Sequence, residues 1–161
     1  MIKINKALLL GALAVLGARS VIAHENDDRY FRSIPRIEGV WLAQVSVTDC
    51  TNPSTTLFGP FQSLLTFHAD GTIAETAPAP PNSQRSVSHG LWRRAGRNSF
   101  DEALVFQRLD VTGVFLGTQV IHATLQLTND SYTAQGKFET KEPHGITVAS
   151  GCTSVVATRF E

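Results

Sequence analysis

The sequence predicts an all-β protein, an eight-stranded antiparallel up-and-down barrel carrying one disulfide. Three observations predict it. Apolar and polar residues alternate from Gly39 onward with the period of two that is typical of half-buried strands. Turn signals such as Asp70-Gly71 recur at fairly even spacing, which favours a barrel or a sandwich. The first and last segments also fit an antiparallel pairing with each other.

The alternation predicts eight strands and two loops rich in glycine or proline. The connection 52–60 contains Pro53 and Pro60, and the loop 77–82 contains Pro78, Pro80 and Pro81, whose rings cannot donate ladder hydrogen bonds. No segment carries a convincing helical period. The predicted strands cover residues 39–48, 61–68, 72–76, 86–94, 100–109, 118–128, 132–140 and 146–160.

The pairing of the two ends rests on Cys50 and Cys152, the only cysteines. In an exported chain two cysteines predict a disulfide rather than a redox or metal pair. Residue numbers of antiparallel partners have a nearly constant sum, and Cys50 with Cys152 gives 202 while Trp41 with Arg159 gives 200. This register predicts that the first and last strands are neighbours, as closure of a barrel requires; a sandwich with adjacent terminal strands gives the same sums.

The N-terminus predicts export. Lys3 and Lys6 precede an apolar run over residues 7–17, and Val21-Ile22-Ala23 offers a cleavage site, so residues 1–23 are predicted to be a signal peptide. The run is shorter than the roughly 20 residues that span a bilayer, so no membrane span remains after cleavage. We expect a periplasmic or extracellular protein, with residues 24–38 as an arm that plugs one end of the barrel domain, 39–161. The apolar contacts of that plug are expected from Tyr30, Phe31, Ile34 and Ile37.

Charge excludes one class of partner. Loss of Lys3, Lys6 and Arg19 with the signal peptide takes the 14 basic residues to 11, against 14 acidic ones. Nucleic acids are bound by clustered Lys and Arg, so no nucleic-acid partner is expected. No phosphate loop, nucleotide fingerprint or metal-ligand spacing is visible, and no cofactor is expected.

Gly39-Val40-Trp41, with Arg159 near the end of the last strand, resembles the calycin arrangement of the lipocalins. That resemblance implies a calycin-like barrel in which Trp41 closes one end and Arg159 stacks over it. The chain is also similar to a group of predicted bacterial secreted proteins of unassigned function, through the segments 64–68, 70–72, 89–92 and 157–161. Both resemblances inform the fold more than the function.

The barrel interior is the first candidate site. An eight-stranded barrel is just wide enough to be filled by side chains or to hold one small ligand. Small residues predicted to face inward, among them Ala43, Ala123 and Gly136, leave room. The leading hypothesis is therefore a binding protein for a small apolar or amphipathic molecule; the other interpretation of the interior is a packed core. The residues predicted to line the cavity are Val45, Phe67, Leu125 and Phe138.

A second hypothesis is a small enzyme that resembles in outline the barrel isomerases and cyclases. Val87, His89 and Leu91 share a face predicted to point inward, and Glu102 follows on the next strand. A buried His89–Glu102 pair would suit general acid–base catalysis, although such a pair is more often a structural hydrogen bond. His122 is expected to face solvent.

Three further features of the sequence are candidate sites. Cleavage after Ala23 would make His24 the N-terminus, where its amine and imidazole together bind copper, although a flexible acidic arm follows it. Arg93, Arg94 and Arg97 cluster at one turn and would capture an anion, or simply be solvated. A solid-core interaction module would recognise another protein through Trp92 and residues 77–85.

Overall fold

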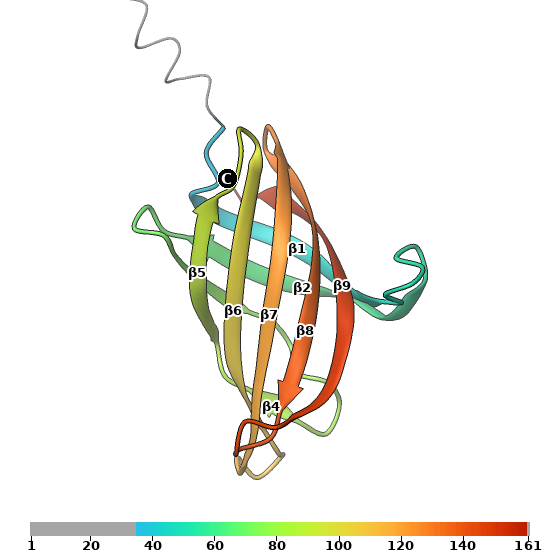
Figure 1. The fold of residues 1–161 in the computed structure, drawn as a ribbon. Coiled ribbons are helices and arrows are strands. Elements are labelled where there is room, and N and C mark those ends of the chain that lie inside the picture. The colour runs from blue at the N-terminus through green and yellow to red at the C-terminus, as the bar shows by residue number, and fades with distance from the viewer. Residues whose placement is uncertain (1–34, 161) are drawn as a thin grey trace, which may run out of the picture.

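The computed structural model describes residues 35–160, which form nine strands in a closed antiparallel barrel (Figure 1). Eight of the strands make up the wall, and β4 is a two-residue addition that pairs with β6 beyond the end of β5. The pairing of β6 with β7 closes the sheet, whose order is β4-β6-β5-β3-β2-β1-β9-β8-β7. The strands are β1 (Gly39–Thr48), β2 (Thr56–Phe67), β3 (Thr72–Thr76), β4 (Gln84–Arg85), β5 (Ser88–Arg94), β6 (Ser99–Leu109), β7 (Phe115–Thr128), β8 (Ser131–Lys141) and β9 (Thr147–Arg159).

The predicted fold class and the predicted closing register are both confirmed. Trp41 pairs with Arg159, and each later pair, down to Thr48 with Cys152, keeps the same sum of 200. In Figure 1, β6 to β9 form the near wall and β1 and β2 cross behind them. The terminal strands are therefore neighbours within one continuous sheet, and the sandwich alternative is excluded.

One end of the barrel is closed by Trp41, which is fully buried. The Arg159 guanidinium carbon lies 4.3 Å from the centre of the indole ring, which confirms the stacking that the calycin resemblance implies. Arg159 also donates to the carbonyls of Glu38 (2.8 Å) and Arg36 (2.6 Å), and the indole Nε1 donates to the carbonyl of Ile37 (2.7 Å). Residues 36–38 are thereby held across this end.

The structure describes only residues 35–38 of the arm that was predicted to plug one end of the barrel. Ile37 is fully buried against the core, as expected. Tyr30, Phe31, Ile34, His24 and the predicted signal peptide lie outside the described residues.

The predicted start of two strands differs from the observed one by three residues or more, and the two-residue strand β4 was not predicted. β2 begins at Thr56 rather than at residue 61, because a bulge accommodates Pro60: Val45 pairs with Phe61, but Val47 pairs with Phe58. Gly59 adopts a φ of 100° at this irregularity, where a side chain would be strained. β7 likewise begins at Phe115 rather than at residue 118, whereas the loop 77–82 contains no strand, as predicted.

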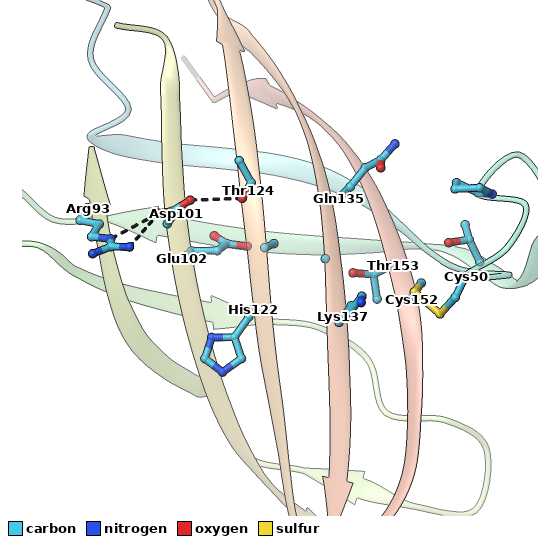
Figure 2. Close-up of a pocket in the computed structure, with 14 residues that line it drawn as sticks. Cys50, Arg93, Asp101, Glu102, His122, Thr124, Gln135, Lys137, Cys152 and Thr153 are labelled. Carbon is cyan, nitrogen blue, oxygen red and sulfur yellow. Dashed lines mark hydrogen bonds and ion pairs between the residues drawn. A yellow bond between two sulfur atoms is a disulfide. The ribbon is translucent and has the colours of Figure 1, made fainter. Parts of the chain in front are cut away.

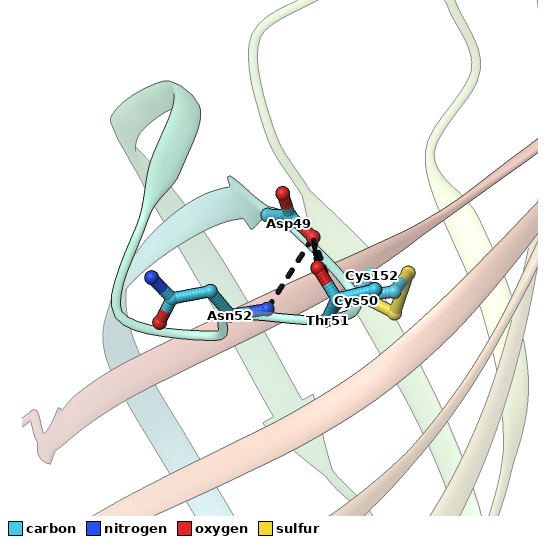
Figure 3. Close-up of a disulfide and its surroundings, with 5 residues drawn as sticks. All are labelled: Asp49, Cys50, Thr51, Asn52 and Cys152. Atoms are coloured by element: carbon cyan, nitrogen blue, oxygen red, sulfur yellow. Dashed lines mark hydrogen bonds between the residues drawn. A yellow bond between two sulfur atoms is a disulfide. The ribbon is translucent and has the colours of Figure 1, made fainter.

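The predicted disulfide joins Cys50, just after β1, to Cys152 in β9, with the two Cα atoms 5.2 Å apart (Figure 3). The turn beside it is ordered by Asp49, whose carboxylate accepts hydrogen bonds from the backbone N–H and hydroxyl of Thr51, both at 2.7 Å. These bonds hold the pKa of Asp49 below its ordinary value. Disulfides persist in oxidising environments, so the bridge indicates a location outside the cytoplasm. No helix among residues 35–160 is long and apolar enough to cross a membrane.

We expect the double substitution Cys50→Ser and Cys152→Ser to lower the free energy of unfolding by about 4 kcal/mol. The bridge spans 102 residues, and closing so long a loop removes much of the entropy of the unfolded chain. Urea unfolding followed by tryptophan fluorescence measures the loss, with the reduced wild-type protein as the control that should match the variant. A loss below about 1 kcal/mol would contradict this account of the bridge.

Candidate functional site

The half of the interior at the β4 end is hollow. A cavity of about 460 Å³ is lined by apolar side chains of five wall strands, by β4 and by the loop before it. Leu116 and Pro81 line the cavity and are exposed, so it reaches the surface. Its apolar lining consists of Val45, Val47, Phe58, Phe61, Phe106, Leu109, Leu116, Ile121 and Phe138, with Pro78, Ala79, Pro80 and Pro81 from the loop.

A row of small residues crosses the sheet at the level of Thr153, which lines the cavity. Ala123 pairs with Gly136, which pairs with Thr153, so three adjacent strands carry little side-chain volume at one level. A Cβ atom at Gly136 would lie 2.8 Å from the Cβ of Ala123 and 2.7 Å from the carbonyl oxygen of His122. The close approach of the neighbouring backbone and side chain at this level requires glycine at position 136.

A buried ion pair borders the cavity. Glu75 of β3 is 5% exposed and accepts hydrogen bonds from Ser63 (2.8 Å), Ser88 (2.5 Å) and Arg85 (2.6 Å). Arg85 belongs to β4, and its guanidinium also lies 3.7 Å from the centre of the Phe106 ring. A buried carboxylate is tolerated when its partners are complete, as they are here. The pair also fastens β4 and the loop 77–83 to the interior.

A second carboxyl group at this level, that of Glu102, is unpaired. Glu102 is 7% exposed, and its Oε2 has no hydrogen-bond partner among the described residues. The hydroxyl of Tyr132, a residue 2% exposed, is equally without one. Both side chains line a hollow of about 30 Å³ between the packed core and the cavity. Four residues, Val45, Glu75, Ile121 and Thr153, line both the hollow and the larger cavity.

Burial determines the ionisation of these two groups. Loss of hydration, and secondly the charge of Glu75, raises the pKa of Glu102 to about 8. Burial, with smaller contributions from Glu102 and Glu75, raises the pKa of Tyr132. At neutral pH both groups therefore carry their protons, so each can donate a hydrogen bond into the hollow.

Two of the four residues predicted to line the cavity do so. Val45 and Phe138 line it, but Phe67 (2% exposed) and Leu125 (fully buried) lie in the packed core near Trp41. All four face inward. The alternation identifies the face of a strand, whereas the distance along the barrel axis follows from strand tilt and register.

The predicted His89–Glu102 pair does not form. Ser88, Gly90 and Trp92 face inward on β5, so His89 is exposed on the outer face; the expectation that it points inward is wrong. Glu102 does face inward, and its register partner on β5 is Trp92. The alternation of apolar and polar residues did not reveal which face of β5 points inward, because the inward residue Ser88 is polar. Its hydroxyl donates a hydrogen bond to Glu75 on another strand.

The arginine cluster and Trp92 have partners within the fold. Arg94 donates to the carbonyls of Pro35 and Arg97, both at 2.6 Å, and its guanidinium lies over the Phe100 ring. Arg93 pairs with Asp101 at 3.1 Å. The ring of Trp92 packs against Phe67 and Phe100 instead of standing on the surface.

A second hollow, of about 490 Å³, borders β6 to β9 beside the disulfide (Figure 2). Most of its lining residues are polar or charged, and Asp101 accepts hydrogen bonds there from Arg93 and from Thr124 (3.1 Å). His122 is exposed, as predicted. No group of three or more His, Cys, Asp or Glu residues suited to a metal ion occurs within residues 35–160.

Comparisons of the chain with protein-family models, curated proteins and solved structures found no match. By its structure the protein is a closed eight-stranded antiparallel barrel, consistent with a calycin-like fold, with a mainly apolar cavity at one end.

We expect Glu102→Gln to stabilise the protein increasingly as the pH rises from 4.5 towards 8. Between the ordinary pKa of 4.5 and the folded value of about 8, the unfolded carboxyl is ionised while the folded one keeps its proton. Unfolding then releases a proton, so the stability of the wild type falls with pH by on the order of 4 kcal/mol through this group. Below pH 4.5 both states are protonated and the contribution disappears.

Urea unfolding at pH 4.5 and at pH 8 measures the difference between variant and wild type. Glu139→Gln is the matched control, because Glu139 is half-exposed on the outer face of β8. If the free energy of unfolding changed equally with pH in the wild type and in Glu102→Gln, Glu102 would be ionised in the folded protein.

Proposed function

We propose that this protein is exported and binds one small apolar or amphipathic molecule inside the barrel. The observation that carries the proposal is the cavity of about 460 Å³, whose walls are mainly apolar and aromatic and which reaches the surface. Its volume lies within the roughly 300–1,000 Å³ typical of small-molecule sites. Export is supported by the sequence of residues 1–23 together with the disulfide.

The division of the interior supports a binding role over a solid-core interaction module. Near Trp41 the side chains are packed, with Phe67, Phe100, Leu125 and Tyr132 all almost fully buried. At the β4 end, aromatic residues line open space instead. An unfilled apolar cavity weakens a fold because its lining lacks contacts, and a ligand would supply them.

The chemistry of the walls indicates how such a molecule would lie. Val45, Ile121 and Phe138 offer apolar contact along the length of the cavity, while Arg108 and Gln119 add polar groups to its lining. Arg108 forms no ion pair within residues 35–160. The resemblance of Gly39, Trp41 and Arg159 to lipocalins belongs to the same proposal, because barrels of that class hold one small ligand in the interior.

The apolar fluorophore N-phenyl-1-naphthylamine is expected to bind the wild type saturably, with one site per chain. Val45→Phe places a larger ring in the wall and should weaken binding at least about tenfold, since overfilling a site excludes its ligand. Val156→Phe is the matched control: Val156 is 59% exposed, on the outer face of β9, and its replacement should leave the affinity unchanged. Fluorescence titration measures both, with near-ultraviolet circular dichroism to confirm folding. Equal affinities in the two variants would place the fluorophore outside the barrel.

A further inference from the structure

We infer that Glu102 and Tyr132 form a polar subsite at the inner end of the cavity, where two neutral donors receive an acceptor oxygen of an uncharged ligand, such as a ketone. The inference rests on the proposed function, because it names the ligand class that the same cavity takes. It adds a specific chemistry to a site otherwise defined by apolar contact.

The hollow that Glu102 and Tyr132 line has a volume of about 30 Å³, which exceeds the roughly 10–15 Å³ of open space that one water molecule requires. It adjoins the main cavity along Val45, Glu75, Ile121 and Thr153, which line both. A terminal carbonyl group therefore fits the hollow while the rest of a ligand stays among the apolar walls.

Two neighbouring carboxyl groups, those of Glu75 and Glu102, differ in their hydrogen-bond partners. Glu75 accepts hydrogen bonds from three side chains of the chain itself, those of Ser63, Arg85 and Ser88. Glu102 Oε2 and the Tyr132 hydroxyl have none among the described residues, although both are buried. Buried polar groups in proteins are satisfied almost without exception. Two such groups facing one hollow indicate that their partner comes from outside the chain.

The groups that line the hollow favour an uncharged partner. Three titratable groups line the hollow: Glu75 from β3, Glu102 from β6 and Tyr132 from β8. Arg85 from β4 lies outside this lining, but its guanidinium is 2.6 Å from the Glu75 carboxylate and offsets its charge. A ligand carboxylate would meet Glu75 and a second acid. A ligand ammonium would require Glu102 to ionise where burial opposes charge. A neutral acceptor oxygen meets no repulsion from Glu75 and does not require Glu102 to ionise. Glu102 and Tyr132 can both donate hydrogen bonds to it.

The test measures displacement of N-phenyl-1-naphthylamine by decan-2-one at pH 6.5. We expect Tyr132→Phe, which keeps the ring packed on Trp41, and Glu102→Leu each to weaken the ketone about tenfold, as loss of a buried donor does. Glu102→Gln keeps an N–H donor and should retain the wild-type affinity within about threefold. Glu139→Gln, on the outer face, is the control.

A pH profile of the wild type tests the same inference without relying on a destabilising substitution. Raising the pH from 6.5 to 9.5 ionises Glu102, which then accepts instead of donating, so ketone affinity should fall in the wild type and stay constant in Glu102→Gln. Undiminished ketone affinity in Tyr132→Phe and Glu102→Leu, with the fluorophore still bound, would overturn the subsite and leave the proposed function intact. Tighter binding of decylamine, lost in Glu102→Gln, would overturn it in favour of an ion pair. If neither fluorophore nor ketone binds the wild type, the proposed function fails and the subsite with it.

Discussion

Closure of the barrel depends on the ladder between β1 and β9, in which Trp41 lies opposite Arg159. At one end of this ladder the guanidinium stacks on the indole and bonds to the backbone of residues 36 and 38. At the other end the disulfide joins Cys50 to Cys152. A slip of one residue would turn every inward side chain of a strand outward, so this doubly held register determines which residues meet inside the barrel.

The interior that results has three levels with different physical characters. Aromatic side chains packed around Trp41 make the first, and they exclude space for a ligand. The second is polar: Glu75 is neutralised by Arg85, while Glu102 keeps its proton because burial penalises its charge. The third is the apolar cavity. The polar level thus lies between packed core and open chamber, where a bound molecule would meet hydrogen-bond donors only after burying its apolar body.

The ion pair between Arg85 and Glu75 joins the polar level of the interior to β4 and to the loop that precedes it. Arg85 is on the two-residue strand β4, which holds only two register pairs with β6. The Arg85 side chain bonds to Glu75 and lies over the Phe106 ring. These contacts hold β4 in place in addition to its few backbone hydrogen bonds. The loop 77–83, which forms part of the cavity wall, is therefore held in place by a buried ion pair as well as by backbone pairing.

Much of the fold was predictable from sequence because its signals are local or paired by simple arithmetic. The alternation located eight wall strands, and the constant sum of residue numbers identified Trp41 and Arg159 as partners. The first part of β2 was missed because Pro60 reads as a loop residue, and only the bulge opposite Val45 and Val47 accommodates it. The prediction of which face of β5 points inward was wrong, because the polar residue Ser88 faces inward and donates a hydrogen bond to Glu75 on β3.

The candidate site was predicted only in part, for a related reason. By itself the sequence determined the fold class, the closing pair of strands, the disulfide and the inward face of most strands, because these follow from periodicity and residue numbering. Only the tertiary structure decided that Val45 and Phe138 line a cavity while Phe67 and Leu125 fill a core, since depth along the axis depends on tilt and register. It alone also decided that Glu75 has hydrogen-bond partners while the Oε2 atom of Glu102 has none among the described residues, because hydrogen bonds between strands depend on which side chains the closed barrel brings together.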